Sequence, residues 1–204
     1  MENQEYLNQI AGQNRPLEKP RNGILSSKFF IVSVIGIVLF FLIMIIGGIV
    51  GGNKDGLKSK NYALSLHLEN TSAVIKNYQS SIKSSVLRSN TASLYSAFSD
   101  INKKLNDYMS EKYSLKAKDM DKKIADEATV NKDGLEVELF EAKINGILDR
   151  TFAYKMAYEI SMVMTEESQI YNSAKDDTLK EILSESYTSL EKLYDKFNDF
   201  SETK

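Results

Sequence analysis

Residues 29–50 read FFIVSVIGIVLFFLIMIIGGIV and contain no charged side chain. At about 1.5 Å of rise per residue, a helix of this length spans roughly 33 Å, enough to cross a hydrocarbon core of about 30 Å. The stretch therefore predicts one transmembrane helix, which anchors the chain in a lipid bilayer. It divides the 204 residues into a short tail before the span and a much longer segment after it.

A cleaved signal peptide is the alternative interpretation of this stretch. The apolar part of a signal peptide has about 7 to 15 residues and precedes a small-residue cleavage site. Here the run is longer and ends in glycines, so an uncleaved anchor is favoured. The tail before the span carries four Lys and Arg residues, and residues 51–60 carry three. This small excess and the positive-inside rule favour a single-pass cell-membrane protein with a cytoplasmic N-terminus and an extracytoplasmic C-terminal domain.

The glycines at the end of the span have two interpretations. Gly47 and Gly51, and likewise Gly48 and Gly52, form overlapping GxxxG patterns, which let two membrane helices pack closely. The same glycines weaken helix formation where the chain leaves the membrane, which would make a hinge. Their position at the end of the span favours the hinge, which we place at residues 51–56.

The rest of the chain falls into regions of different composition. The N-terminal tail is polar and holds both prolines, which is typical of disorder. Beyond the juxtamembrane glycines, only three glycines and no proline interrupt the chain, so long helices are expected. The predicted organisation is a disordered cytoplasmic tail at 1–28, a transmembrane helix at 29–50, a hinge at 51–56 and a helical domain at 57–204.

Apolar residues recur at helical spacing throughout 57–204, which predicts an all-α antiparallel bundle of about four helices. The first helix covers about 57–88 and ends at a turn near Ser89 and Asn90. The second carries Leu94 to Met109, and its charged continuation at 112–132 is either helix or loop. A turn at 131–134 (NKDG) precedes a third helix at 135–172, whose wide apolar face suggests the most buried helix.

The fourth predicted helix has the most regular pattern. Thr178 and Glu181 have the spacing of a capping box at its start. Its apolar residues then follow in steps of four and three, which indicates a bundle seam or, alternatively, a surface that waits for a partner. The seam comprises Leu183, Tyr187, Leu190, Tyr194 and Phe197.

Two tyrosines fall outside the apolar stripes. Tyr95 and Tyr171 are therefore candidate exposed anchors, since tyrosine is enriched where proteins bind one another.

The two halves of the helical domain carry charges of opposite sign. Residues 57–132 carry 13 basic against 8 acidic residues, a net of +5, whereas 133–204 carry 8 against 16, a net of −8. The whole chain has a net charge of only −2, so nucleic acid is not an expected partner.

No arrangement of residues typical of common catalytic chemistry stands out in the sequence. There is no cysteine, hence no disulfide and no thiolate site, and His67 is the single histidine. One histidine cannot build a ferritin-like dimetal site, and no nucleophile elbow accompanies it for a triad. Neighbouring acids such as Glu166 and Glu167, or Asp176 and Asp177, are more often solvated or capping than catalytic. We expect no enzyme activity, no metal and no cofactor.

These patterns suggest a structural or protein-interaction module of a bacterial cell envelope. The partner would be an envelope protein, and homo-oligomerisation is a further candidate. The alternative is a ligand-binding or sensor-like domain, in which an apolar cavity between the third and fourth predicted helices holds a lipid or small amphiphile.

Overall fold

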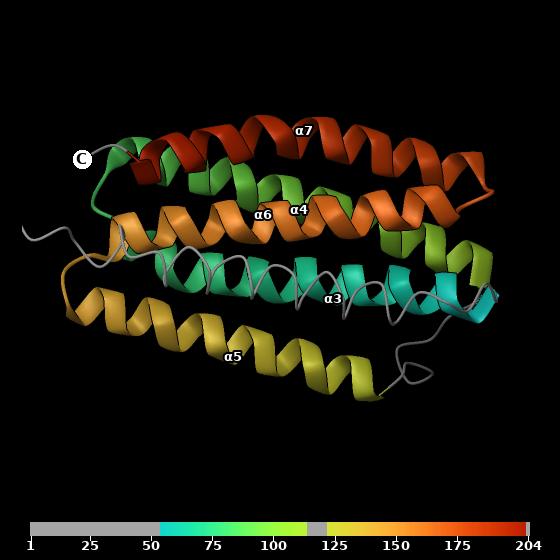
Figure 1. Cartoon of the computed structure of the whole chain (residues 1–204), viewed down its shortest axis with the longest axis horizontal. Coiled ribbons are helices and arrows are strands. Elements are labelled where there is room, and N and C mark those ends of the chain that lie inside the picture. Colours follow the sequence, from blue (N-terminus) through green and yellow to red (C-terminus); the bar gives the residue numbers. More distant parts are fainter. Residues whose placement is uncertain (1–53, 114–121, 203–204) are drawn as a thin grey trace, which may run out of the picture. The chain divides into compact units, whose positions relative to one another are not determined.

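A computed structural model of the chain describes residues 54–113 and 122–202. These residues form α-helices joined by short turns, with no β-strand among them (Figure 1), so the predicted all-α class is confirmed for this part of the chain. The described residues contain five α-helices and one short 3-10 helix, η2: α3 (Lys54–Tyr78), η2 (Gln79–Ser81), α4 (Ser85–Tyr113), α5 (Lys122–Ile144), α6 (Leu148–Ser173) and α7 (Asp177–Glu202).

Four of the helices form a bundle and the fifth lies outside it. α3 packs on α4, α4 on α7, α7 on α6 and α6 on α3, which closes a ring of four helices. Consecutive helices run in opposite directions, and α5 lies along the outer side of α3 and α6 (Figure 1). The predicted bundle of about four helices therefore describes the ring, and α5 is an additional helix between α4 and α6.

The ring is held by apolar seams with steps of three and four. In α4 every member of the seam is buried, and α7 repeats the same steps on its buried face. A repeat averaging 3.5 residues keeps a seam facing its neighbours along the full length of a bundle. The α4 seam comprises Leu87, Thr91, Leu94, Phe98, Ile101, Leu105 and Tyr108.

The first turn lies earlier than the predicted one. α3 ends at Tyr78 and α4 begins at Ser85, so the turn predicted at 89–90 is wrong. Ser84 caps α4, because its Oγ accepts a hydrogen bond of 3.3 Å from the Leu87 N–H. The Asp149 carboxylate from α6 accepts further bonds of 3.0 Å and 2.7 Å from the backbone N–H groups of Lys83 and Ser84. A carboxylate distant in the sequence therefore stabilises this turn.

The turn predicted at 131–134 is also wrong, because those residues lie inside α5. α5 ends instead at Ile144, and Gly146 adopts a positive φ of 73°. The Ile147 N–H donates to the Ala142 carbonyl at 2.9 Å, and the Gly146 N–H to the Lys143 carbonyl at 3.2 Å. This is the Schellman arrangement, in which glycine takes the left-handed position after a helix. It divides the helix predicted at 135–172 into the end of α5 and α6.

The start of α7 is capped by Asp176 instead of the predicted Thr178. Asp176 Oδ1 accepts hydrogen bonds from the backbone N–H groups of Thr178, at 3.1 Å, and Leu179, at 3.4 Å. Its other oxygen lies 2.5 Å from Lys112 Nζ at the end of α4. The interaction with Lys112 lowers the pKa of Asp176. The capping interpretation of this acidic residue is thus confirmed.

Several predictions fall outside the described residues. These are the tail at 1–28, the span at 29–50 and the four glycines Gly47, Gly48, Gly51 and Gly52. Of the segment predicted as a hinge at 51–56, residues 54–56 belong to the first turn of α3. Among the helices that the structure describes, none combines the length and the apolar character that a membrane span requires.

Candidate functional site

The outer face of α5 carries a stripe of exposed apolar side chains. Val130, Val137 and Ile144 are separated by seven residues each, and Phe140 lies between the last two. Between 57% and 69% of each of these residues is exposed. Ile147, in the turn after α5, continues the repeat and is 56% exposed. We call Val130, Val137, Phe140, Ile144 and Ile147 the outer stripe.

The opposite face of α5 is fixed to the bundle, so the orientation of the outer stripe is determined. Leu135, Leu139 and Ala142 are buried against the ring. The Tyr78 hydroxyl of α3 donates to the Glu136 carbonyl at 2.9 Å, and the Asn70 side-chain amide donates to a carbonyl of α5 at 3.1 Å. These contacts leave the outer stripe pointing away from the core.

The sequence analysis placed the wide apolar face of its third helix in the core, and this is wrong for part of that face. Phe140, Ile144, Ile147, Tyr154 and Tyr158 are exposed. For Phe140 and Ile144 the reason is that α5 lies outside the ring and buries only one side. Tyr154 and Tyr158 lie on α6, a ring helix that also has an exposed side. The seven-residue spacing of Val130, Val137 and Ile144 was the signal for a separate apolar stripe, but the expected turn at 131–134 concealed it.

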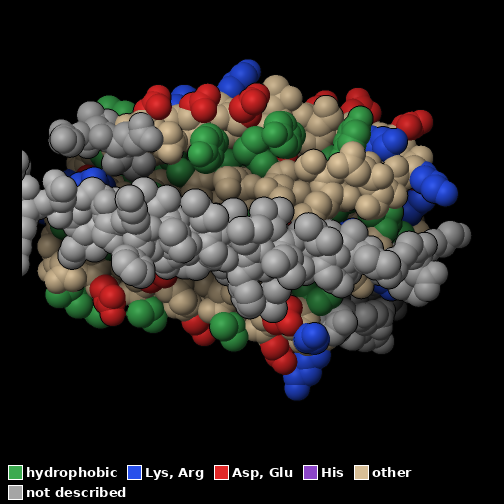
Figure 2. Space-filling view, viewed as in Figure 1, with side chains coloured by type: hydrophobic (Ala, Val, Ile, Leu, Met, Phe, Trp, Pro, Cys, Tyr) green, Lys and Arg blue, Asp and Glu red, His purple; other side chains and the backbone are tan. Residues whose placement is uncertain are grey.

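Acidic side chains surround the outer stripe. In the space-filling view, hydrophobic groups appear at intervals along the lower edge of the molecule, over α5, with acidic groups between them (Figure 2). Asp126, Asp133 and Glu141 are exposed on α5 beside the stripe, and Lys122, Lys123 and Lys143 are exposed near the two ends of the helix. The surface is therefore apolar with an acidic margin along its middle and basic residues near both ends of α5.

The single histidine joins α3 to α6. His67 Nε2 lies 2.7 Å from Glu159 Oε2, and His67 Nδ1 lies 3.1 Å from Glu166 Oε1. Burial alone would lower the pKa of His67, but the two carboxylates outweigh it and raise the pKa to about 10. At neutral pH the ring is thus an imidazolium that donates to both carboxylates. A protonated imidazole has no lone pair to act as a general base.

A second carboxyl is buried between α6 and α7. Glu167 is 1% exposed, and the Ser186 hydroxyl donates a short hydrogen bond to its Oε1. Its Oε2 has no partner among the described residues. Burial raises the pKa of Glu167 to about 8, although the bond from Ser186 acts in the opposite direction. The interpretation of Glu167 as a solvated acid is therefore wrong.

The predicted seam of α7 is only partly buried. Leu183, Leu190 and Phe197 are core residues, as predicted, but Tyr187 is 41% exposed and Tyr194 is half-buried. Ser186 and Leu193, one residue earlier in each case, occupy the core positions. The predicted steps of three and four residues are therefore right, but the prediction chose the wrong residue at two positions, one residue too late in each case.

The two displaced tyrosines line a groove between α6 and α7. The groove has a volume of about 390 Å³ and includes Met164. Hydroxyl and amide groups complete its wall, so its lining is mixed: Ser161, Thr165, Ser168 and Gln169. The predicted third helix, at 135–172, contains α6, and the fourth predicted helix corresponds to α7. The groove therefore lies between the two helices where the alternative function expects an apolar cavity.

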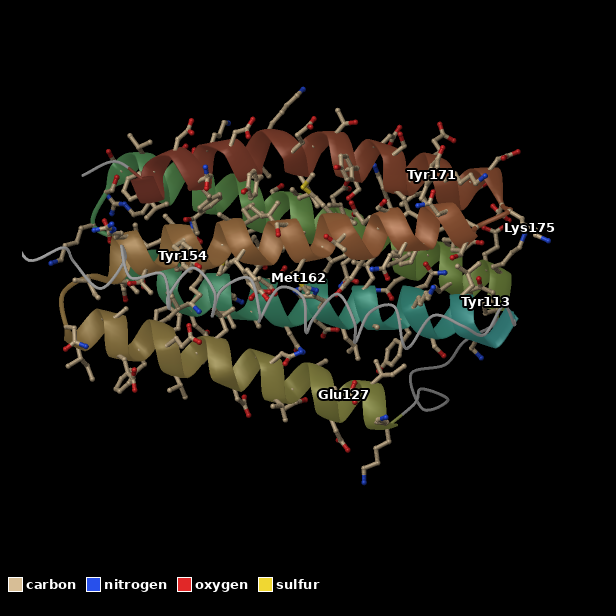
Figure 3. The ribbon with its side chains drawn as sticks, viewed as in Figure 1. Tyr113, Glu127, Tyr154, Met162, Tyr171 and Lys175 are labelled. Atoms are coloured by element: carbon tan, nitrogen blue, oxygen red, sulfur yellow. The ribbon has the colours of Figure 1, made fainter. Side chains whose placement is uncertain are left out.

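Both candidate anchor tyrosines are exposed. Tyr95 lines a second groove of about 390 Å³ between α3 and α4, beside Lys76 and Asn102. Tyr171 lies near the end of α6, beside α7 (Figure 3). Lys180 Nζ is 5.5 Å from the centre of its ring, a cation–π contact between the two helices. Tyr171 thus has a partner within the bundle, and Tyr95 forms part of a shallow polar groove.

The described residues contain no group of three or more acidic or histidine side chains that could hold a metal ion. No protein-family model matches the chain, and no curated protein and no solved structure matches it. The class of this protein is therefore defined by its own geometry: a ring of four helices with a fifth, outer helix that carries an exposed apolar stripe.

Proposed function

We propose that the chain is a single-pass membrane protein of the cell envelope that presents its helical domain as a protein-interaction module. In this proposal residues 29–50 cross the membrane, the tail is cytoplasmic and the helical domain is extracytoplasmic. The outer stripe of α5 is the contact surface. The observation that carries the proposal is the exposure of large apolar residues on one side of a helix whose other side is fixed in the core.

The spacing of the outer stripe suits a helical partner. The seam of a coiled coil has apolar residues at alternating steps of three and four, which repeat every seven residues. Val137, Phe140 and Ile144 follow these steps. Scattered exposed apolar residues are normal on a protein surface, but those of the outer stripe recur at steps of three, four and seven residues along one side of α5. The acidic margin of the stripe makes an anionic lipid surface a poor alternative, because such a surface attracts basic segments.

Photo-crosslinking in cells tests this proposal. A photo-reactive amino acid replaces Val137 in the full chain, and the same substitution at Val86 provides a matched control. Both residues are exposed valines, but Val86 lies on α4 and is not a member of the outer stripe. We expect a discrete crosslinked protein band from position 137 and none from position 86. Equal labelling at both positions, or none at position 137, would contradict the proposal.

A second candidate function is binding of a small amphiphile in the groove between α6 and α7. Met164, Tyr187 and Tyr194 provide apolar and aromatic contacts, and the hydroxyl-bearing wall provides polar ones. Native mass spectrometry of the purified chain checks this candidate. A bound lipid that is retained by the parent chain and lost from Met164→Gln would favour it, and the absence of any adduct would count against it.

A further inference from the structure

The groove between α3 and α4 is lined by polar side chains from both helices, and several of their hydrogen-bonding groups are unused. Its volume of about 390 Å³ lies within the range of small-molecule sites. We propose that this groove binds a sugar that carries an oxyanion, either a carboxylate or a phosphate group. The groove is separate from the outer stripe, so the inference does not depend on the proposed function.

Ser72 provides an unpaired donor in the wall of the groove. Its Oγ is buried and has no hydrogen-bond partner in the part of the chain that the structure describes. Hydroxyls inside a helix commonly donate to the carbonyl four residues earlier, as those of Thr91 and Ser93 do on α4. Ser72 makes no such bond to Leu68, although it lies inside α3. A buried hydroxyl without a partner is unfavourable, and a ligand atom in the groove would supply the missing bond.

Asn102 provides two more donors. Its Oδ1 accepts hydrogen bonds from Ser65 Oγ, at 2.6 Å, and from Asn106 Nδ2, at 3.0 Å. These bonds fix which atom of the Asn102 amide is the acceptor, and its Nδ2, with two N–H donors, takes no part in them. Because Asn102 also lines the groove, the neutral groups of the wall offer donors to a ligand that is rich in acceptors.

Two lysines add positive charge to the same lining. Lys76 of α3 and Lys103 of α4 both line the groove, and neither forms a salt bridge among the described residues. Ammonium groups beside neutral donors bind an oxyanion through charge-assisted hydrogen bonds. Glu69 is the one acidic residue of the lining. A carboxylate accepts hydrogen bonds from hydroxyl groups, and a sugar provides these.

The antiparallel packing of α3 and α4 orders these groups along the groove. The bond from Ser65 to Asn102 shows that these two residues are level. Later residues of α3 therefore lie level with earlier residues of α4, which places Lys76 and Tyr95 toward one end and Glu69 nearer Asn102. Seven residues separate Glu69 from Lys76, about 10 Å along the helix. This length accommodates a small sugar whose oxyanion lies toward Lys76 and whose hydroxyls lie toward Glu69.

Tyr95 distinguishes a sugar from a simple anion. Its side chain lines the groove and is partly exposed. An aromatic ring packs against the C–H face of a sugar ring, while its hydroxyl remains able to form hydrogen bonds. Inorganic phosphate has no apolar face and would gain nothing from this contact. The aromatic ring beside the donors therefore favours an anionic sugar.

Equilibrium dialysis of the purified full chain tests the proposal, in a polyoxyethylene detergent that has neither a sugar nor a phosphate group. The probes are glucuronate, glucose-6-phosphate, glucose and inorganic phosphate. We expect one of the two sugar anions to bind several-fold more tightly than glucose and inorganic phosphate, and the tighter of the two identifies the oxyanion. Failure of both sugar anions to bind, or binding of glucose or inorganic phosphate that equals theirs, would overturn the proposal.

Substitutions locate the bound sugar anion. Tyr95→Ala and Lys76→Gln should each weaken its binding several-fold. Tyr154→Ala and Lys192→Gln, at exposed positions of α6 and α7, are the matched controls and should leave binding unchanged. Ser72→Ala should weaken binding without lowering the melting temperature, because it removes a hydroxyl that has no partner in the described structure. Full binding by all three groove variants would place the ligand elsewhere and overturn the proposal.

Discussion

His67 on α3 and Glu159 on α6 form a direct ion pair, with 2.7 Å between Nε2 and Oε2, and Glu166 holds the other ring nitrogen. The two acids are seven residues apart on α6, so they lie on one face and enclose the ring from both sides. This arrangement fixes the position of α3 along α6. Since α5 packs on the same two helices, it also supports the surface that carries the outer stripe.

The His67 ion pairs predict a pH dependence of stability. The pKa of His67 is raised from 6.5 to about 10 in the folded chain, so the folded state holds its proton more tightly than the unfolded state. The stabilisation is fully present below about pH 6.5 and is lost as the pH rises through 10. Thermal unfolding between pH 6 and 10.5 should show this loss, and His67→Gln should remove it. Lys104→Gln, which breaks an exposed pair with Glu185, should keep the parent's pH profile.

The raised pKa of Glu167 predicts a second pH dependence of folding stability, at lower pH than that of His67. Its pKa is raised from 4.5 to about 8, because burial opposes ionisation. Between these values the unfolded chain releases the proton while the folded chain retains it, so stability falls as the pH rises. Glu167→Gln keeps a neutral side chain of the same shape. It should therefore gain stability relative to the parent as the pH increases from 4.5 to 8, as measured by urea denaturation. A constant difference at all pH values would show that Glu167 does not titrate in this range.

The α7 seam predicts different effects at two neighbouring positions. Leu190 is fully buried, so Leu190→Ala should destabilise the domain by about 2 to 5 kcal/mol through lost burial and a residual cavity. Tyr187 is exposed, and Tyr187→Ala should change stability by only about 0.5 kcal/mol. Equilibrium unfolding measures both. Equal effects of the two substitutions would mean that the seam has the phase expected from the sequence.

Two glycines test the corrected position of the turn. Gly134 lies inside α5 with free space around it, so Gly134→Ala should stabilise the domain by about 0.5 to 1 kcal/mol. Gly146 has a φ of +73°, which disfavours a side chain, and Gly146→Ala should destabilise the domain by roughly 1 to 2 kcal/mol. Thermal unfolding of the two variants measures the signs. The opposite signs would be expected if the turn were at 131–134.

The helices could be predicted from the sequence more reliably than the turns between them. Helical periodicity predicted the all-α class and the core roles of Leu183, Leu190 and Phe197, because burial follows spacing within one helix. The turn between α3 and α4 depends on a contact between residues distant in the sequence. Asp149 stabilises the turn at Lys83 and Ser84, and the sequence around that turn does not predict this contact.

The candidate sites were less predictable than the fold. Tyr95 and Tyr171 were correctly expected to be exposed, but the cation–π contact with Lys180 depends on how α6 and α7 pack. The outer stripe was present in the spacing of Val130 and Val137. Its exposure could not be inferred, because periodicity does not distinguish a helix inside a four-helix ring from one that lies outside it.

Thiol labelling of Val137→Cys and Val86→Cys tests most directly whether the outer stripe is a contact surface. The two valines are similarly exposed, at 57% and 63%, so in isolated chains their cysteines should react with a water-soluble maleimide at similar rates. In native membranes, the account predicts that labelling at position 137 is slowed at least several-fold relative to position 86. Dilution in detergent should remove this difference. Equal labelling rates in native membranes would contradict the account.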